Sequence, residues 1–234
     1  MIEAPNDPAD MAIRARDVSL SLGSQAAPVD ILKAVDLDVP HGQTLAVLGA
    51  SGSGKSSLMS VLSGLERATA GSVRVNGLAY DSLDEDGLAQ ARRGRIGIVL
   101  QSFHLLPTMT AIENVAVPLE LAGHAGAFAR ASAELAAVGL AHRLDHYPAQ
   151  LSGGEQQRVA IARAIAPGPA ILFADEPTGN LDAATGESVM DLLFERRRAT
   201  GSTLIVITHD PALALRCERV VEVRDGRIVA DRLQ

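Results

Sequence analysis

The chain has 234 residues, which is enough for one full-sized domain or two small ones with a buried core. Its composition is 47% hydrophobic and 21% charged, with 21 glycines, 11 prolines and no tryptophan, which argues against a disordered chain, a collagen-like chain or an aromatic platform for nucleic acid. The 21 basic and 28 acidic residues leave a net charge of −7, so the chain as a whole has no attraction for nucleic acid or anionic lipid.

The ends of the chain and its single cysteine bear on its surroundings. Cys217 cannot form an internal disulfide, so we expect a reducing compartment. Residues 1–10 hold three acids and two prolines without an apolar run, so we expect a disordered lead-in and not a secretory signal. No window reaches the roughly 18 apolar residues of a membrane span, because Pro118 and Glu120 interrupt the nearest candidate. The sequence therefore predicts a single domain over 11–234 with no intrinsic membrane span.

The first predicted elements are strands near 13–20 and 31–39, an N-terminal antiparallel β portion with an insertion-like stretch from Ser24 to Asp30 between the strands. A short apolar strand at 44–48 follows, and apolar residues at helical spacing begin after Ser57. The segment between them, Gly49 to Ser56, matches the pattern G-x-x-x-x-G-K-[ST]. The motif therefore lies at a strand-to-helix turn.

This turn has the chemistry of a phosphate site. Glycines let backbone N–H groups surround a phosphate, and the helix N-terminus adds a positive field. Lys55, one of only two lysines among 21 basic residues, can reach terminal phosphates, and the Ser56 hydroxyl can bind magnesium. A flexible glycine-serine loop is the alternative, but it would need neither the lysine nor the flanking strand and helix. The residues predicted to bind the phosphates are Gly49, Ala50, Ser51, Gly52, Ser53, Gly54, Lys55, Ser56 and Ser57.

The middle of the chain changes from strands to helices. Short strands are predicted at 72–75 and 96–100, and Gln101 follows the second of them. From about 112 to 165 the pattern is helical and alanine-rich, with breaks at Gly123, Gly126, Gly139 and Pro148. This pattern predicts a helical subdomain, about 103–165, inserted into an α/β core.

A helix with a polar start is predicted at Leu151-Ser-Gly-Gly-Glu-Gln-Gln-Arg158. Ser152 and Glu155 have the spacing of a capping box, so an ordinary helix N-terminus explains both. It does not explain Gly153 and Gly154, since each glycine costs about 1 kcal/mol relative to alanine unless something must approach the backbone closely. We therefore predict a second anion site at this segment.

An apolar strand from Ile171 ends in two adjacent carboxylates, Asp175 and Glu176. Such a pair suits the C-terminal edge of a parallel sheet beside a phosphate loop. Because side chains alternate along a strand, Asp175 can hold magnesium through water while Glu176 orients and polarises the attacking water. Taken alone, a strand followed by Asp-Glu-Pro is also an ordinary exit into a turn.

The last predicted strands lie at 203–207 and 219–223, and Arg224-Asp-Gly-Arg227 has the form of a hairpin turn. His209 follows the first of these strands. Its alternative interpretation is an ordinary strand-end histidine, because Asp210-Pro211 has the form of a helix N-cap and first helical residue. The remaining five histidines receive no role.

These segments occur in the order of an ABC-type ATPase, which the chain resembles over nearly its whole length. The resemblance is carried by the phosphate loop, Gln101, the LSGGE segment, Asp175-Glu176, Asn180-Leu181-Asp182 and His209. Within the family, the chain is most similar to the ATPases of lipoprotein-release, macrolide-efflux and FtsE-like systems, and to YbbA-like proteins in particular. The resemblance implies a P-loop NTPase (RecA-like) core, ATP and Mg²⁺ as cofactors, and a head-to-tail homodimer that closes around two ATP molecules.

The resemblance also implies roles for individual residues. Glu176, His209 and Lys55 would be catalytic, with His209 holding the terminal phosphate and the attacking water. Gln101 would touch the metal and sense the attached membrane subunit, and Asp182 would link the two sites of the dimer. The metal-binding set would be Ser56, Gln101 and Asp175. The residues that contact the other subunit's ATP would be Ser152, Gly153, Gly154 and Glu155.

Two features depart from the family pattern. The family usually has an aromatic residue after the first strand to stack on adenine, whereas this chain offers Leu22 or its neighbours there. We therefore expect weak base stacking. Glu155 stands where many relatives have glutamine, although the resembling subgroup commonly carries the acid.

The resemblance thus implies an ATP-hydrolysing subunit that drives a separate integral-membrane permease from the cytoplasmic face of the cell membrane. Export, lipoprotein or lipid extraction, and mechanotransmission all remain open. The candidate docking surface for the permease is Phe103 to Asn114. The equally supported alternative is that this segment is a covered loop packed on the core. The competing class is a soluble ABC-type ATPase acting on nucleic acid, which the acidic balance, the single cysteine and the lack of heptads disfavour. A phosphotransferase kinase would leave the LSGGE segment and His209 unexplained.

Overall fold

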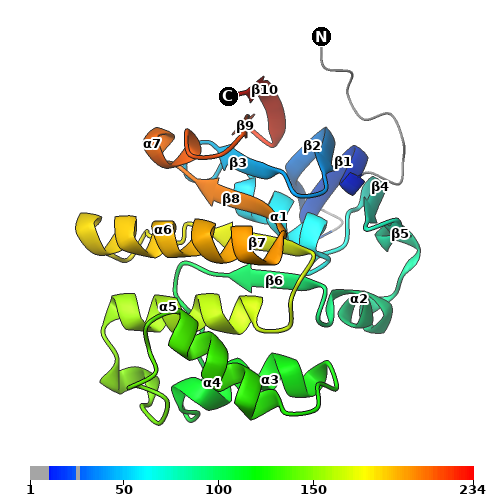
Figure 1. The fold of residues 1–234 in the computed structure, drawn as a ribbon. Coiled ribbons are helices and arrows are strands. Elements are labelled where there is room, and N and C mark those ends of the chain that lie inside the picture. The colour runs from blue at the N-terminus through cyan, green and yellow to red at the C-terminus, as the bar shows by residue number, and fades with distance from the viewer. Residues whose placement is uncertain (1–10, 25–26) are drawn as a thin grey trace. The chain divides into compact units, whose positions relative to one another are not determined.

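The computed structural model describes residues 11–24 and 27–234, and the chain divides into two compact units. The first unit runs to Arg92 and resumes at Thr203–Gln234, and the second unit is Arg93–Ser202. The predicted lead-in, 1–10, lies outside the described residues. Figure 1 labels the elements of both units.

The first unit is built mainly from strands. Its elements are β1 (Met11–Ser24), β2 (Ala27–Pro40), β3 (Thr44–Leu48), α1 (Lys55–Ser63), β4 (Ala70–Val75), β5 (Leu78–Ala79), a 3₁₀ turn (Tyr80–Ser82), α2 (Glu85–Arg92), β8 (Thr203–Thr208), α7 (Pro211–Ala214), β9 (Arg219–Arg224) and β10 (Arg227–Leu233). β1 pairs antiparallel with β2 and β4, and β4 pairs antiparallel with β5. β3 pairs parallel with β8 and β9, and β9 pairs antiparallel with β10.

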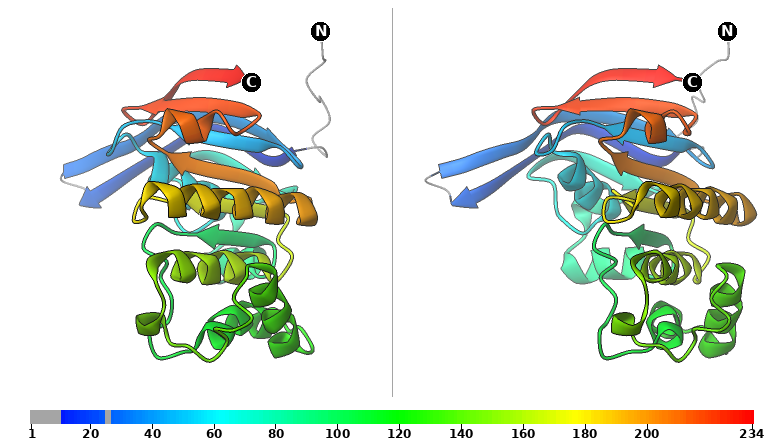
Figure 2. Two further views of the ribbon diagram at one scale, coloured as in Figure 1. Left: turned by 60° about the vertical axis from the view of Figure 1, so that its left-hand side comes forward. Right: turned by 90° about the vertical axis from the view of Figure 1, so that its left-hand side faces the viewer.

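The ribbon formed by β1 and β2 is longer than the sequence predicted. Leu22 pairs with Val29 and Gly23 with Pro28, so the described part of the stretch that read as an insertion continues both strands. Both views of Figure 2 show the far end of this ribbon extending past the other strands of its unit. The insertion-like interpretation was wrong. Leu22 and Val29 are both exposed, so this part of the ribbon lacks the alternation of apolar and polar residues that identifies a strand with one buried face.

The central strands of this unit are parallel and buried. Every residue of β8 is buried, and so are Thr44, Leu45, Ala46 and Val47 of β3. Near-continuous apolar runs of this kind are typical of parallel strands covered on both faces. The turn between β9 and β10 places Asp225 at φ 48° and Gly226 at φ 76°, which is the positive-φ pair of a tight hairpin and confirms the turn predicted at 224–227.

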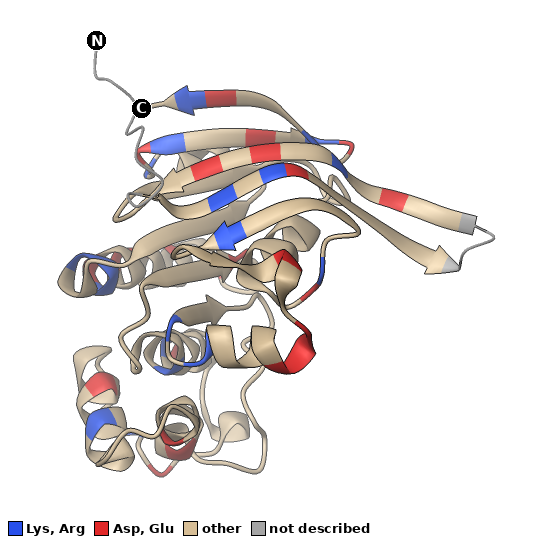
Figure 3. Ribbon diagram, turned by 90° about the vertical axis from the view of Figure 1, so that its right-hand side faces the viewer, with Lys and Arg blue, Asp and Glu red and all other residues tan. Residues whose placement is uncertain are grey.

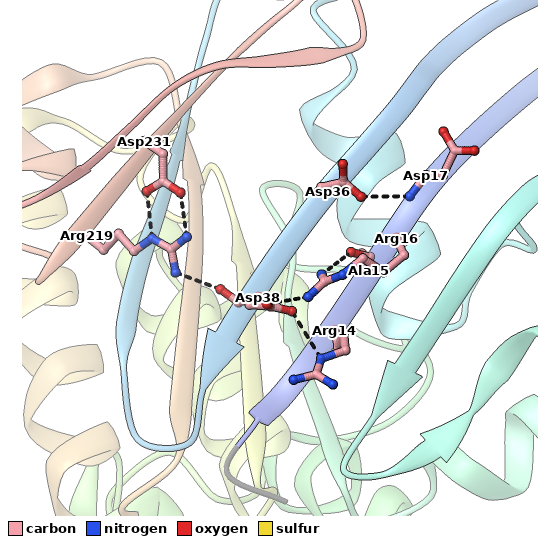
Figure 4. Close-up of polar contacts among 8 residues, drawn as sticks. All are labelled: Arg14, Ala15, Arg16, Asp17, Asp36, Asp38, Arg219 and Asp231. Atoms are coloured by element: carbon pink, nitrogen blue, oxygen red, sulfur yellow. Dashed lines mark hydrogen bonds and ion pairs between the residues drawn. The ribbon is translucent and has the colours of Figure 1, made fainter. Parts of the chain in front are cut away.

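Lysine, arginine, aspartate and glutamate positions are interspersed along the outer strands of this unit (Figure 3). Several of these residues form ion pairs. The Asp38 carboxylate accepts from Arg16 at 2.5 Å and pairs with the Nε of Arg14 at 3.5 Å. Arg219 binds both oxygens of Asp231, at 2.7 and 2.5 Å, and donates to the main-chain oxygen of Asp38 at 2.6 Å (Figure 4). The network therefore connects β1, β2, β9 and β10 through three arginines and their acceptors.

The second unit combines a strand pair with a set of helices. Its elements are β6 (Ile96–Val99), α3 (Ala111–Leu121), α4 (Ala127–Ala137), a 3₁₀ turn (Pro148–Gln150), α5 (Gly153–Ile165), β7 (Ile171–Asp175) and α6 (Ala183–Thr200). β6 and β7 pair in parallel, with Val99 opposite Ala174. Helix α5 lies so close to β6 that a Cβ on Gly97 would meet the Ala164 main-chain oxygen at 2.4 Å.

The helices of this unit share an apolar core of their own. It is formed by buried residues from α3, α4 and α5, with Leu119, Leu135 and Val159 fully buried. The four breaks predicted at glycines and at Pro148 all fall between or next to these helices. Among the described residues, no helix combines the length and the apolar composition that a membrane crossing needs.

Candidate active site

The predicted phosphate loop connects β3 to α1 in the first unit. Gly52 and Gly54 adopt left-handed backbone conformations, with φ of 77° and 103°. Helix α1 starts at Lys55 without a side-chain cap at Gly54 and without an acid in its first turn. The N–H groups of the first helical turn therefore keep their positive field for an anion, which is the arrangement that binds phosphate.

The loop is held by close packing that only glycine allows. A Cβ on Gly49 would meet the Val223 main-chain oxygen at 2.4 Å, and one on Gly54 would meet the Ile31 oxygen at 3.0 Å. The Gly226 N–H donates to the Ser53 oxygen at 3.0 Å, which ties the loop to the β9–β10 turn. The loop shape is therefore set by its neighbours in the same unit and is not that of a flexible glycine-serine segment.

Lys55 is buried at the centre of this loop. Its Nζ donates to the main-chain oxygens of Gly49 and Ala50, at 2.8 and 2.9 Å. These bonds direct a cationic group into the curve of the loop, where a bound phosphate would lie. Ser53, two residues before Lys55, is buried as well, and the neighbouring Ser56 is exposed in the first turn of α1.

His209 lies at the same edge of the sheet as the phosphate loop. β8 pairs with β3 so that Thr208 is opposite Leu48, and the loop follows Leu48 while His209 follows Thr208. The helix predicted at Asp210-Pro211 is present, because Asp210 caps α7 by accepting the Ala212 N–H at 2.8 Å. His209 itself is exposed, so the strand-end position is confirmed and leaves the ring accessible for chemistry.

The second unit brings Gln101 and the two carboxylates to one edge of the β6–β7 pair. Gln101 follows β6, Asp175 ends β7, and the parallel register places these ends side by side. Glu176 has φ 44°, which is rare for a residue with a side chain.

The Gln101 loop and the loop after β7 also touch directly. A Cβ on Gly179 would lie 2.6 Å from the Gln101 Nε2, so the glutamine side chain lies over this glycine. Asn180 donates from Nδ2 to the Gln101 main-chain oxygen at 3.0 Å. The unit therefore fixes Gln101 against the segment that follows Glu176.

The predicted capping box at the LSGGE segment is present. The Ser152 hydroxyl accepts the Glu155 N–H at 3.3 Å, and the Glu155 carboxylate accepts the Ser152 N–H at 2.8 Å. The other Glu155 oxygen accepts from Arg143 at 2.9 Å. The Ser152 N–H, more than any other group, lowers the pKa of Glu155 to about 2. The Glu155 side chain is thus engaged within its own subunit, and Arg143 is a residue of this segment that the sequence analysis missed.

The glycine pair has a packing role that the sequence did not reveal. A Cβ on Gly154 would lie 2.6 Å from the Thr185 Cγ2, and one on Gly153 would lie 3.3 Å from a Leu181 methyl group. Something therefore does approach this backbone closely, and it is the start of α6. Asp182 caps that helix by accepting the Thr185 N–H at 3.0 Å. The Thr185 side chain, followed by this N–H, lowers the pKa of the Asp182 carboxyl group.

The predicted residues thus fall into two groups. The first unit carries the phosphate loop with Lys55 and Ser56, and His209 at the same edge. The second unit carries Gln101, Asp175, Glu176 and the LSGGE segment. Leu22, the candidate for the adenine contact, lies on the ribbon of the first unit, where it is 45% exposed.

The chain was compared with known proteins. Residues 32–179 match a family model described as ABC transporter. Over 223 residues the chain is 47% identical to the uncharacterized ABC transporter ATP-binding protein YbbA of Escherichia coli (strain K12). The aligned region covers 94% of this chain and 98% of YbbA. It is 49% identical over 217 residues to LolD, the lipoprotein-releasing system ATP-binding protein of Geobacter metallireducens, with 92% and 96% of the two chains covered.

Solved structures include a similar fold. The dimeric ATP-binding cassette MJ0796, captured in a post-hydrolysis state with ADP and Pi, matches with a TM-score of 0.87 and 37% sequence identity. The match covers 94% of this chain and 98% of that one.

Proposed function

This chain belongs to the ABC transporter family, and from that membership we propose that it is the ATP-hydrolysing subunit that drives a separate integral-membrane permease. The predicted resemblance to YbbA-like and lipoprotein-release ATPases is confirmed by the identities of 47% and 49%. The predicted P-loop NTPase fold is confirmed by the match to MJ0796. The alternative, a soluble ATPase acting on nucleic acid, has no such support.

The observation that carries the proposal is the phosphate loop. Binding of a nucleotide's terminal phosphates needs three features that this loop has. They are an uncapped helix start, two left-handed glycines and a buried lysine directed into the curve of the loop. In the role we propose, Lys55 neutralises charge that develops on the transferred phosphoryl group. The residues proposed to hold ATP in the same subunit are Gly49 to Ser57 and Gln101.

Glu176 is the proposed general base, because a carboxylate at this strand end can orient and polarise water. His209 is the proposed partner that holds the terminal phosphate and that water. The exposed position of His209 after β8 and the left-handed backbone of Glu176 after β7 support these roles.

Magnesium is proposed as the second cofactor, held by Ser56, Gln101 and Asp175. Within the described residues there is no group of three or more His, Cys, Asp or Glu that could cage a metal. That fits Mg²⁺, which usually takes one or two carboxylates together with phosphate oxygens and water. When bound, the ion would neutralise charge on the phosphates; the residues here hold and orient it.

We propose that two copies close head to tail, with Ser152, Gly153, Gly154 and Glu155 of one copy facing the ATP of the other. The dimeric state of MJ0796 with ADP and Pi supports a nucleotide-dependent homodimer. Because Glu155 is bonded to Ser152 and Arg143, its contribution here is to hold the helix start, and the backbone of the segment would face the nucleotide.

The proposed partner is an integral-membrane permease that holds this subunit at the cytoplasmic face of the cell membrane. LolD is the ATP-binding protein of a lipoprotein-releasing system, which supports lipoprotein or lipid extraction ahead of export or mechanotransmission. Leu106 to Thr108 are exposed and suit the proposed docking surface, whereas Asn114 is fully buried and holds this loop through Leu106, Met109 and Thr110. We further propose one ATPase domain over 11–234, with helices from about 103 to 165 as its inserted subdomain.

The replacement Glu176→Gln tests the catalytic half of this proposal. We expect ATP binding to persist, a dimer to accumulate with ATP in light scattering after size exclusion, and turnover to fall at least about 100-fold. Glu187→Gln, at an exposed site on α6, is the matched control and keeps wild-type turnover. Wild-type turnover in Glu176→Gln would contradict the role.

Affinity capture of the tagged chain from solubilised membranes tests the partner. Mass spectrometry should find a polytopic protein with a large extracytoplasmic domain. Recovery of soluble or nucleic-acid-bound proteins alone would overturn the transport role and leave the ATPase chemistry standing.

A further inference from the structure

Helix α5 starts at the LSGGE segment and runs along β6 (Figure 1). Two of its polar side chains, Gln157 and Arg163, donate to the main chain of the two loops that carry Gln101 and Glu176. All of these residues belong to the second unit. The contacts therefore connect helix α5, which begins at the LSGGE segment, with both loops at the β6–β7 edge.

Arg163 holds the loop after Gln101. Its guanidinium donates to the main-chain oxygens of Phe103 and His104, at 2.7 and 2.6 Å. Both acceptor residues have left-handed backbones, with φ of 60° and 47°, and such a conformation persists in non-glycine residues only where surrounding contacts hold it. Burial lowers the pKa of Arg163, so a cation has been desolvated to make these two bonds.

Gln157 holds the loop after Glu176. It is fully buried, and its Nε2 donates to the Pro177 main-chain oxygen at 2.8 Å. Its Oε1 has no hydrogen-bond partner among the described residues, so the hydrogen bond that this buried amide makes there is the one from its Nε2. The bond holds the carbonyl of Pro177, the residue after Glu176, whose own φ is 44°.

The two loops held in this way are also linked to each other through the Asn180 bond to Gln101. Helix α5 is therefore bonded to both loops, and the loops are bonded to each other. We propose that Arg163 and Gln157 are positioning residues through which the LSGGE helix sets the places of Gln101 and Glu176 for hydrolysis. This inference rests on the proposed ATPase function.

The test separates kcat from ATP affinity. Arg163→Met removes both donors and keeps an apolar stem, and Gln157→Met removes the other donor at nearly equal volume. Each should lower kcat at least about tenfold, because a misplacement of about 1 Å can cost 100-fold in rate, while the Kd for ATP changes less than about threefold. Arg163→Lys keeps the charge and one donor and should recover part of the lost kcat.

Arg130→Met is the matched control. Arg130 also donates to a main-chain oxygen of this unit, that of Ala166 at 3.3 Å, and pairs with Glu134, and both of these partners lie outside the two loops. It should lower the melting temperature without changing kcat. If Arg163→Met does not fold, Arg163→Lys and Gln157→Met carry the test.

Wild-type kcat in Arg163→Lys and in Gln157→Met would overturn the inference, and so would a loss of kcat in Arg130→Met equal to theirs. These results differ from a failure of the proposed function, which would appear as absence of ATP hydrolysis in the wild-type chain.

Discussion

The replacement Gly154→Ala can separate the two explanations of the glycine pair, close packing within the subunit and close approach of an anion. The new Cβ would lie 2.6 Å from the Thr185 Cγ2, about 0.8 Å inside the 3.4 Å edge of ordinary van der Waals contact. Overpacking of this kind costs about 1–3 kcal/mol, and the better helix propensity of alanine returns up to about 1 kcal/mol. We therefore expect the free energy of unfolding to fall by about 1–2 kcal/mol.

Thr185→Ser removes the methyl group that the new Cβ would meet and keeps the hydroxyl. Urea unfolding of the wild type, both single variants and the double variant forms a double-mutant cycle. The double variant should recover about 1 kcal/mol relative to the sum of the single changes. ATP turnover measured on the same four proteins gives the second readout.

The two explanations predict different turnover in the double variant. If the backbone of Gly154 must also face a phosphate, the double variant regains stability but its turnover stays at least about tenfold below wild type. Recovery of turnover together with stability would refute the anion role of this glycine. A single variant Gly154→Ala as stable as wild type would refute the packing argument itself.

Two further predictions concern charged pairs. Arg219→Lys loses the two-point contact with Asp231. Because Asp231 is partly exposed, the free energy of unfolding in urea titrations at low salt should fall by about 1 kcal/mol. No change would show that the pair does not contribute to folding stability. The Ser152 N–H lowers the pKa of Glu155 from 4.5 to about 2, so the stability that this carboxylate contributes is present above pH 4.5 and is lost as the pH falls towards 2. Glu155→Gln should flatten the stability profile in that window, and identical profiles for both proteins would contradict the shift.

Sequence reasoning succeeded where the signal is local. The phosphate loop needs glycines, a lysine and a serine in one short run, so Gly49 to Ser56 identified both the turn and its place between strand and helix. The capping box at Ser152 and the hairpin turn at 224–227 likewise depend on neighbouring residues, and both are present. The helix breaks were also found, because glycine and proline interrupt helices without help from the rest of the fold.

It failed where an element has no strong pattern of its own. The sequence analysis assigned nothing to α6, whose buried residues Gly186, Val189, Met190 and Leu193 make only a narrow stripe. Its end signals were nevertheless available, since Asp182 caps it and Gly201 ends it in a left-handed conformation. The far end of the β1–β2 ribbon was missed for the related reason that its residues are exposed and so follow no alternation.

The contacts that organise the β6–β7 edge were beyond sequence reasoning for a different reason. Arg163 and Gln157 bond to main-chain oxygens, and any residue type supplies a main-chain oxygen, so no partner residue in the sequence points to them. The Thr185 methyl group is similar, because it explains Gly154 only once α6 is placed against α5. A glycine pair that the sequence predicts to be an anion site therefore has a packing cause in the same subunit. Packing and anion binding can coexist only if the face of the backbone opposite Thr185 is the one presented to the nucleotide. That requirement is what the double variant at 154 and 185 measures.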